Sequence, residues 1–120
     1  MKIESYKQLI VWQKSLRLVK EIYLLTSKYP SSEKYGLANQ MRRAAVAIPS
    51  NIAEGSRRGS AKDYSNFLRI ADGSTAELET QLIISKDLYP QLDYTLSIDL
   101  TVQVQKMLIT MIKKISLRDS

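Results

Sequence analysis

Residues 9–29 read LIVWQKSLRLVKEIYLLTSKY, and their apolar side chains recur at the spacing of an amphipathic α-helix. They form two neighbouring stripes, so the apolar arc covers nearly half of the helix circumference. A helix of an isolated four-helix bundle needs an arc of only about 100–140°. The excess predicts that part of this helix packs against another subunit. The first stripe consists of Leu9, Trp12, Leu16, Val19 and Tyr23, and the second of Val11, Leu18, Ile22, Leu25 and Tyr29.

Clusters of Pro, Gly and Ser interrupt the helical periodicity at three places, around Pro30, at residues 55–60 and around Pro90. Only short connections remain between the segments, as is typical of antiparallel neighbours. We therefore predict an all-α protein, an antiparallel up-and-down four-helix bundle in which residues 1–120 form a single domain. The predicted helical segments are residues 5–28, 33–58, 61–89 and 94–116.

Local signals refine two of these helices. Pro49 lies inside the second segment, yet the apolar stripe keeps its phase across it, so we predict one helix with a kink near Pro49. Ser60 and Asp63 resemble a capping box at the start of the third helix. Gly73, within the third helix, is expected to permit close approach of another helix.

The last segment carries an equally wide apolar arc, which includes Met107 and Met111. Two such arcs in one small chain favour a homo-oligomer, although methionines at helical spacing are also common as core filler. Trp12 is expected to anchor either the interior or an interface. The pattern leaves open which apolar face is core and which is interface. The residues that we expect at the oligomer interface are Trp12, Leu18, Ile22, Met107 and Met111.

Composition narrows the possible functions. The chain has 120 residues with no Cys and no His, which excludes disulfides, thiolate or imidazole metal ligands, and Ser-His or Cys-His nucleophile pairs. We expect no metal ion, no cofactor and no catalytic residue. No window approaches 18 uncharged apolar residues, so we also expect a cytoplasmic protein with no membrane partner.

Basic residues gather around the turn that follows the second helix. The chain as a whole has a net charge of +6, a balance that suits polyanionic partners. Clustered cations at this turn could bind the phosphates of RNA or DNA. Equally, they could complement the end of a helix and form an ordinary solvated face. The candidate nucleic-acid-binding residues are Arg57, Arg58, Lys62 and Arg69.

Polar residues share the second face of the second helix. Arg43 and Glu54 are too far apart along the helix to pair with each other, so we expect partners elsewhere. Glu77 lies in an otherwise apolar or small stripe of the third helix and is the expected partner of Arg43. An internal polar network that fixes helix register is favoured over acid–base catalysis. Its predicted members are Gln40, Arg43, Asn51, Glu54 and Glu77.

Four motifs, in this order, resemble the bacterial four-helix-bundle proteins known as the 23S rRNA intervening-sequence family. The resemblance covers about residues 6–115 and departs from the family's pattern at Ala47, where a small hydroxyl residue is typical. It implies a ring, most simply a homopentamer, and no catalytic residue. The motifs are Leu9-x-x-Trp12, Tyr35-Gly36-Leu37-x-x-Gln40-x-Arg42-Arg43-Ala44-Ala45, Ile48-Pro49-Ser50-Asn51-Ile52-Ala53-Glu54-Gly55 and Phe67-Leu68-x-Ile70-Ala71-x-Gly73-Ser74-x-x-Glu77-Leu78-Glu79.

Three classes of function follow from these observations. The first is a non-enzymatic homo-oligomeric scaffold with a basic surface that binds RNA or DNA. The resemblance adds that relatives include an accessory protein of diversity-generating retroelements, which contacts nucleic acid and a reverse transcriptase. The second is a protein–protein interaction module with no nucleic-acid role. The third and least favoured is a helical ribonuclease that uses Glu54 or Glu77 with Arg43, because helical ribonucleases of the Arg-x-His kind need a histidine.

Overall fold

The protein is an all-α four-helix bundle. Its computed structural model describes residues 5–119, with side chains described as far as residue 117. Two short 3₁₀ helices precede α1 and α2, and no strand occurs in the described residues. The all-α prediction is confirmed. The elements are η1 (Tyr6–Gln8), α1 (Ile10–Thr26), η2 (Ser31–Glu33), α2 (Leu37–Ser56), α3 (Ala61–Leu88) and α4 (Thr95–Asp119).

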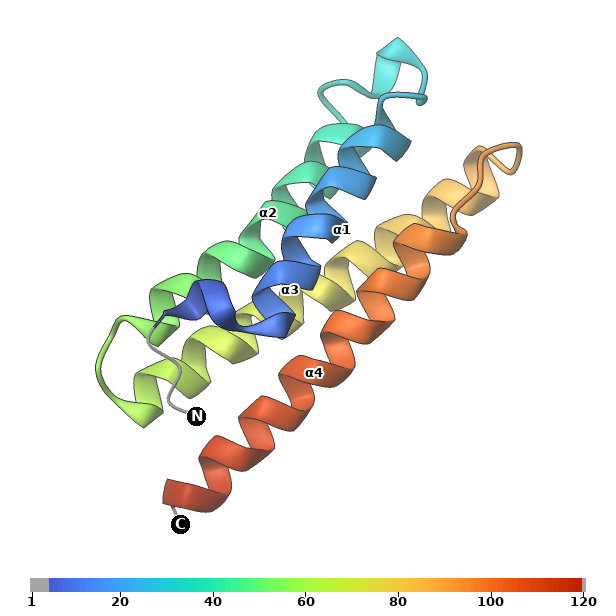
Figure 1. Cartoon of the computed structure of the whole chain (residues 1–120). Helices are drawn as coiled ribbons and strands as arrows, with labels where there is room; N and C mark the ends of the chain where they lie inside the picture. The colour runs from blue at the N-terminus through green and yellow to red at the C-terminus, as the bar shows by residue number, and fades with distance from the viewer. Residues whose placement is uncertain (1–4, 120) are drawn as a thin grey trace.

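Each helix packs against two others, in the cyclic order α1, α2, α3, α4 and back to α1. Figure 1 shows that the connections between consecutive helices lie at alternate ends of the molecule. The result is a rod that measures 47 × 23 × 22 Å. The α2–α3 turn, which carries the predicted basic cluster, lies at the end opposite to the α1–α2 and α3–α4 connections (Figure 1).

Local chemistry explains where α3 begins. The Oγ of Ser60 accepts a hydrogen bond from the backbone N–H of Asp63 at 3.1 Å, and this confirms the predicted cap. Asp63 also places a negative charge in the first turn, where it complements the helix dipole. Gly59 precedes the cap with φ +88°, a left-handed conformation that glycine adopts without steric cost.

Pro49 lies within α2, which is helical from Leu37 to Ser56. Proline has no N–H to donate to the carbonyl of Ala45, one turn earlier. The apolar face of α2 is buried on both sides of Pro49, at Ile48 and Ile52, so packing holds the helix together across the missing hydrogen bond. The kink itself stays a prediction.

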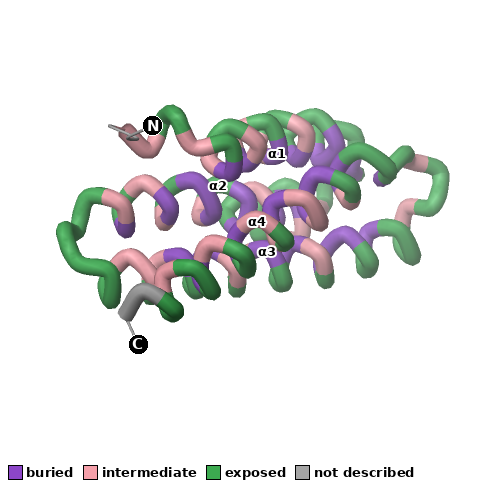
Figure 2. The backbone as a smooth tube through the Cα atoms, turned by 60° about the horizontal axis from the view of Figure 1, so that its bottom comes forward, coloured by how far each residue is buried: buried purple, intermediate pink, exposed green. Residues whose placement is uncertain are grey.

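The core selects one of the two stripes of α1. Leu18 and Ile22 expose none of their surface, and Figure 2 shows the buried positions turned toward the middle of the bundle. The expectation that these two residues lie at a subunit interface is therefore wrong, because their own chain already covers them. The stripe that contains Trp12 is only half-buried or exposed. The buried residues of the selected stripe are Val11, Leu18, Ile22, Leu25 and Tyr29.

Helix length leaves part of this rod incompletely covered. At about 1.5 Å per residue, the 17 residues of α1 are shorter than the 25 residues of α4 by roughly 12 Å. The backbone of Leu9 is extended, with φ −71° and ψ 127°, and separates η1 from α1. α1 therefore begins well inside the length of α4, and the apolar surface of α4 near this point is only partly covered.

Candidate nucleic-acid interface

The candidate interface begins where α2 ends. Arg57 caps the C-terminus of α2, and its backbone N–H donates to the carbonyl of Glu54 at 3.1 Å. Arg58 follows, with its N–H directed to the carbonyl of Gly55 at 3.3 Å. Two cations at this end of a helix complement the partial negative charge of the dipole. The side chains of the predicted basic residues Arg57, Arg58, Lys62 and Arg69 are all exposed.

Arg58 already has two partners within the protein. One Nη lies 2.8 Å from Oε1 of Glu54, and the guanidinium carbon lies 5.0 Å from the centroid of the Phe67 ring. The contact between Arg58 and Glu54 is the only ion pair among the residues whose side chains are described. Glu54 therefore partly neutralises Arg58, whereas no carboxylate of that part of the chain pairs with Arg57.

Lys62 and Arg69 lie on one face of α3, because seven residues make nearly two turns and a rise of about 10.5 Å. Arg69 also borders a cavity of about 520 Å³ between α3 and α4, and Lys113 reaches its other side. Asp72 lines this cavity without pairing with either cation. Sequence reasoning missed Lys113, because packing of α4 against α3 brings it there and no local spacing signals that.

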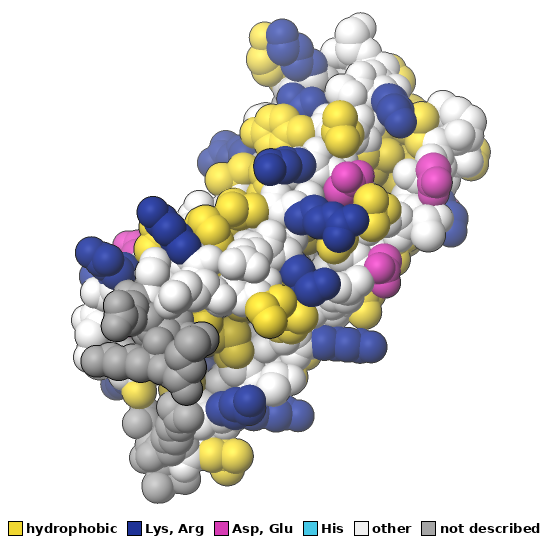
Figure 3. Space-filling view, in the orientation of Figure 1, with side chains coloured by type: hydrophobic (Ala, Val, Ile, Leu, Met, Phe, Trp, Pro, Cys, Tyr) yellow, Lys and Arg dark blue, Asp and Glu magenta, His cyan; other side chains and the backbone are white. Residues whose placement is uncertain are grey.

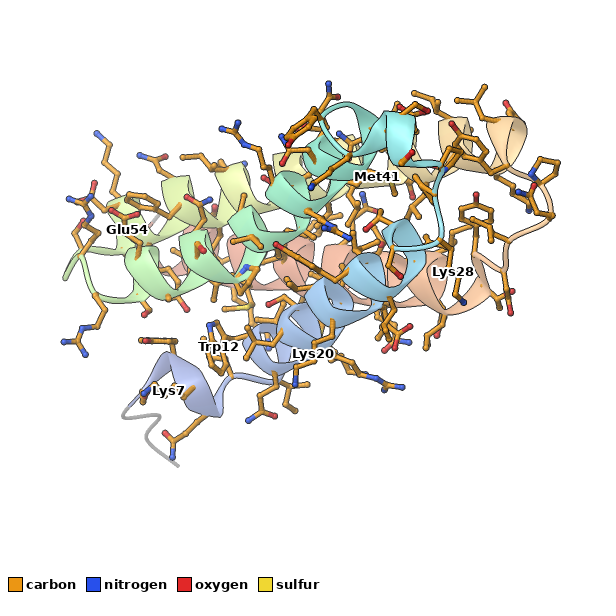
Figure 4. The ribbon with its side chains drawn as sticks, turned by 90° about the horizontal axis from the view of Figure 1, so that it is seen from above. Lys7, Trp12, Lys20, Lys28, Met41 and Glu54 are labelled. Atoms are coloured by element: carbon orange, nitrogen blue, oxygen red, sulfur yellow. The ribbon has the colours of Figure 1, made fainter. Side chains whose placement is uncertain are left out.

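Two of the residues expected at an interface, Met107 and Met111, line a second cavity, of about 580 Å³, between the start of α1 and α4. Both methionines are half-buried. Trp12 follows the lining residue Val11 in sequence and is also half-buried. The ring of Tyr6 packs edge-on against Trp12, with centroids 5.3 Å apart. Figure 4 shows Trp12 near the start of α1. We call this cavity the α1–α4 groove. It is lined by Gln8, Leu9, Ile10, Val11, Lys106, Met107, Thr110 and Met111.

Among the described residues, four of the five shifted pKa values belong to groups at the end of the rod opposite the α2–α3 turn. The fifth is that of Tyr64, in the first turn of α3, and burial raises it. Burial raises the pKa of Tyr29, and a 2.6 Å hydrogen bond from Tyr89 to Glu33 raises the pKa of Tyr89. A hydrogen bond from the backbone N–H of Thr95 lowers the pKa of Asp93. Tyr29, Tyr89 and Asp93 lie at the connections between helices, away from the α2–α3 turn (residues 57–60), which we call the basic turn.

The described residues contain no group of three or more acidic side chains that could hold a metal ion. Within the same residues, no helix is both long enough and apolar enough to cross a membrane.

Comparison with known proteins identifies the family. A family profile described as "23S rRNA-intervening sequence protein" matches residues 7–110. The chain belongs to this family. A solved relative is the crystal structure of a protein with unknown function from the S23 ribosomal protein family of Bacteroides thetaiotaomicron VPI-5482. That structure is 25% identical, has a TM-score of 0.78, and covers 87% of this chain and 99% of its own. No curated protein matches the chain.

The polar residues that carry the resemblance to the 23S rRNA-intervening sequence family do not form the predicted network within one chain. Gln40 and Arg43 are exposed, and no hydrogen bond or ion pair joins either side chain to a described residue. Asn51 donates instead to the carbonyl of Ala47 at 2.7 Å, and Glu54 pairs with Arg58. The expected pair of Arg43 with Glu77 is absent from the described residues.

Arg43 and Glu77 do not pair because Glu77 is not buried. It accepts a weak 3.3 Å hydrogen bond from Gln81, and its stripe of α3 faces solvent, with Ile70 53% and Leu88 57% exposed. Water therefore solvates the Glu77 carboxylate, so it needs no cationic partner. The Glu54–Arg58 pair could have been found from sequence, because residues four apart on a helix are neighbours.

Proposed function

We propose that the protein is a non-enzymatic homo-oligomeric scaffold, most simply a pentameric ring, whose basic surface binds RNA or DNA. One observation carries the proposal: Arg57, Lys62 and Arg69 are exposed near one end of the rod and pair with no carboxylate among the residues whose side chains are described. Cations without partners gain from contact with phosphates, because the nucleic acid releases condensed counterions. The family description names 23S rRNA, so RNA is the first nucleic acid to test.

An oligomer would strengthen a weak patch. Each chain supplies few cations, so a single copy binds phosphates weakly, and several copies in one assembly raise the effective concentration of the remaining sites. The partly covered α1–α4 groove, with Met107 and Met111, supports association of copies. The face shown in Figure 3 also carries many more Lys and Arg than Asp and Glu side chains.

The non-enzymatic part of the proposal is supported by the carboxylates. Glu54 and Glu77 are both exposed, and neither lines a cavity described above. A general acid or base needs a substrate held within hydrogen-bond reach, and an exposed carboxylate outside these cavities has no walls beside it to hold one.

Titration of fluorescein-labelled single-stranded RNA at several salt concentrations tests the proposal. The double variant Lys62→Gln with Arg69→Gln should make the slope of log K against log salt shallower by about 1.4, since each phosphate contact contributes about 0.7. The matched control is Arg17→Gln with Lys20→Gln, which removes the same charge from exposed positions of α1. Affinity that is absent, independent of salt, or equally reduced in both double variants would contradict the proposal.

A second candidate function is favoured by the α1–α4 groove. Its mostly apolar lining fits the side chains of a protein partner as well as those of another copy. If the chain is a protein–protein interaction module with no nucleic-acid role, complexes should survive nuclease and high salt. The RNA titration separates the two functions, because this alternative predicts no salt-dependent binding.

A further inference from the structure

A third cavity, of about 460 Å³, opens on the outer face of α1 and α2. Two arginines and an asparagine line it together with a tyrosine, and no acidic side chain does. It lies on the outer face of α2, so neither the basic turn nor the α1–α4 groove contains it. The lining residues are Tyr23, Asn39, Arg42, Arg43, Val46 and Ala47.

Arg42 is held in place by three contacts. Its Nε donates to Oγ1 of Thr26 at 2.8 Å, and one Nη donates to the carbonyl of Tyr23 at 3.4 Å. The guanidinium carbon lies 4.5 Å from the centroid of the Tyr23 ring. These partners are all uncharged, so they fix the plane of the guanidinium and leave its charge unneutralised. Two of the five N–H groups are used, and three remain for a ligand.

Arg43 and Asn39 complete the polar side of the cavity. They are four residues apart on α2 and therefore neighbours on its surface. Both side chains are exposed, and the guanidinium of Arg43 forms no hydrogen bond or ion pair with any described residue. Two guanidinium groups at one cavity repel each other until an anion enters. A phosphate group suits them, because arginine binds phosphate through two parallel hydrogen bonds.

We propose that this cavity binds the phosphate group of a phosphate ester, with Arg42 and Arg43 as the phosphate ligands. The ring of Tyr23, which is 44% exposed, and the side chain of Val46 supply apolar surface beside the cations. Cavities of about 300–1,000 Å³ hold organic ligands and not only small ions. The esterified group therefore lies against this apolar wall. A free nucleotide and the phosphodiester of a nucleic acid both present the required chemistry.

This site is separate from the surface of the proposed function. Arg57, which caps α2, lies 14 residues after Arg43, about 21 Å along the helix axis. Figure 4 shows Met41 and Glu54, which are close in sequence to Arg43 and Arg57, well separated along α2. A change at either surface should therefore leave the other intact, and failure of one proposal would not entail failure of the other.

A titration of the ¹⁵N-labelled protein tests the phosphate site, with the arginine Nε–H resonances as the readout. The probes are inorganic phosphate, adenosine monophosphate and a single-stranded RNA oligonucleotide, each at constant ionic strength. The Arg42 resonance should shift and saturate, and adenosine monophosphate should bind more tightly than inorganic phosphate. Arg43→Gln should weaken binding at least about tenfold, while Arg57→Gln, an equal loss of charge at the other end of α2, should change it less than about twofold.

A second variant, Arg42→Lys, tests whether binding depends on the guanidinium group and not on charge alone. Arg42→Lys keeps the charge but loses the planar fork and the hydrogen bond to Thr26, so it should also weaken binding several-fold. Displacement of the nucleotide by RNA would assign the site to a nucleic-acid backbone, and its absence would assign the site to free nucleotides. A shift that does not saturate, equal losses in Arg43→Gln and Arg57→Gln, or binding of inorganic phosphate without the nucleotide or the RNA would overturn the proposal.

Discussion

Arg58 is the one cation of the basic turn that a carboxylate already neutralises, and this makes Glu54 a useful residue to change. Glu54→Gln should alter the free energy of unfolding by less than about 0.5 kcal/mol, because both ends of the ion pair are half-exposed. It should also make the salt dependence of RNA binding steeper by about 0.7, because Arg58 becomes free to contact one more phosphate. Anisotropy titrations at about 50 and about 200 mM salt measure that slope.

Glu77→Gln is the matched control for this change. It removes the same charge from an exposed position in the middle of α3, away from the basic turn, and should leave the slope unchanged. If both variants steepen the slope equally, the net charge of the chain governs binding and the basic turn does not.

Tyr29 makes the fold sensitive to high pH. Burial raises its pKa above the ordinary value of 10.0, so the folded chain keeps the proton that the unfolded chain loses. The resulting stability is fully present below pH 10.0 and is lost as the pH rises above that value. In this range Tyr29 should lower the free energy of unfolding by about 1.4 kcal/mol per pH unit.

Tyr29→Phe should reduce that alkaline slope, and urea unfolding at several pH values measures it. Tyr35→Phe is the control, because Tyr35 is 86% exposed. A slope that is the same in the wild-type chain and in Tyr29→Phe would show that other groups cause the alkaline loss of stability.

At the scale of the helices, two glycines separate helix propensity from packing. A Cβ added at Gly73 in α3 would meet no atom within 4 Å, so the expected close approach of another helix does not occur within one chain. Gly73→Ala should therefore raise the free energy of unfolding by up to about 1 kcal/mol through helix propensity alone. A Cβ added at Gly55 in α2 would lie 2.6 Å from Cβ of Phe67 and 3.2 Å from Cδ1 of Tyr64.

Gly55→Ala should destabilise the bundle by about 1–3 kcal/mol, because α2 and α3 must move apart to admit the methyl group. Urea denaturation of both variants measures the two effects under the same conditions. Destabilisation by Gly73→Ala would mean that a second copy packs closely against this position. Neutral behaviour of Gly55→Ala would contradict the tight α2–α3 contact.

The helices themselves could be predicted from sequence because their signals are local. Ser60 and the apolar periodicity placed the third helix at residues 61–89, and α3 spans Ala61–Leu88. The first segment was predicted too long, because the extended backbone at Leu9 separates η1 from α1 and carries no local signal. The choice between the two stripes of α1 depends on which neighbours cover them, so periodicity alone could not make it.

In the candidate site too, local features could be predicted from sequence, whereas contacts between helices could not. Exposure of Arg57 and Lys62 agrees with the sequence pattern, since a polar turn followed by a helix face is a local feature. The placement of Lys113 beside Arg69, and of Arg42 on the ring of Tyr23, depends on contacts between helices that are distant in sequence. The Arg43–Glu77 pair was predicted on the assumption that an apolar stripe must be buried, and this stripe faces solvent.

At the scale of the whole molecule, the two ends of the rod differ in chemistry. One end is held by tyrosine hydroxyls: that of Tyr94 shares its hydrogen between the backbone carbonyls of Ser85 and Tyr89, and that of Tyr89 donates to the carboxylate of Glu33. The other end carries the exposed cations of the α2–α3 turn. A closed ring of such rods would repeat the basic end around a symmetry axis, and a partner with repeated phosphates could then contact several copies at once.

The proposed association can be tested at the α1–α4 groove. Met111→Lys places a charge among its apolar side chains, and desolvation of that charge should disfavour the contact between copies. Light scattering should then report a lower mass than for the wild-type chain, while circular dichroism stays helical, because Met111 is only half-buried within its own chain. Ile83→Lys is the matched control, since Ile83 is an exposed apolar residue of α3 that does not line the groove. If the wild-type chain is monomeric at high concentration, or if only Ile83→Lys dissociates the assembly, the groove is not an interface between copies.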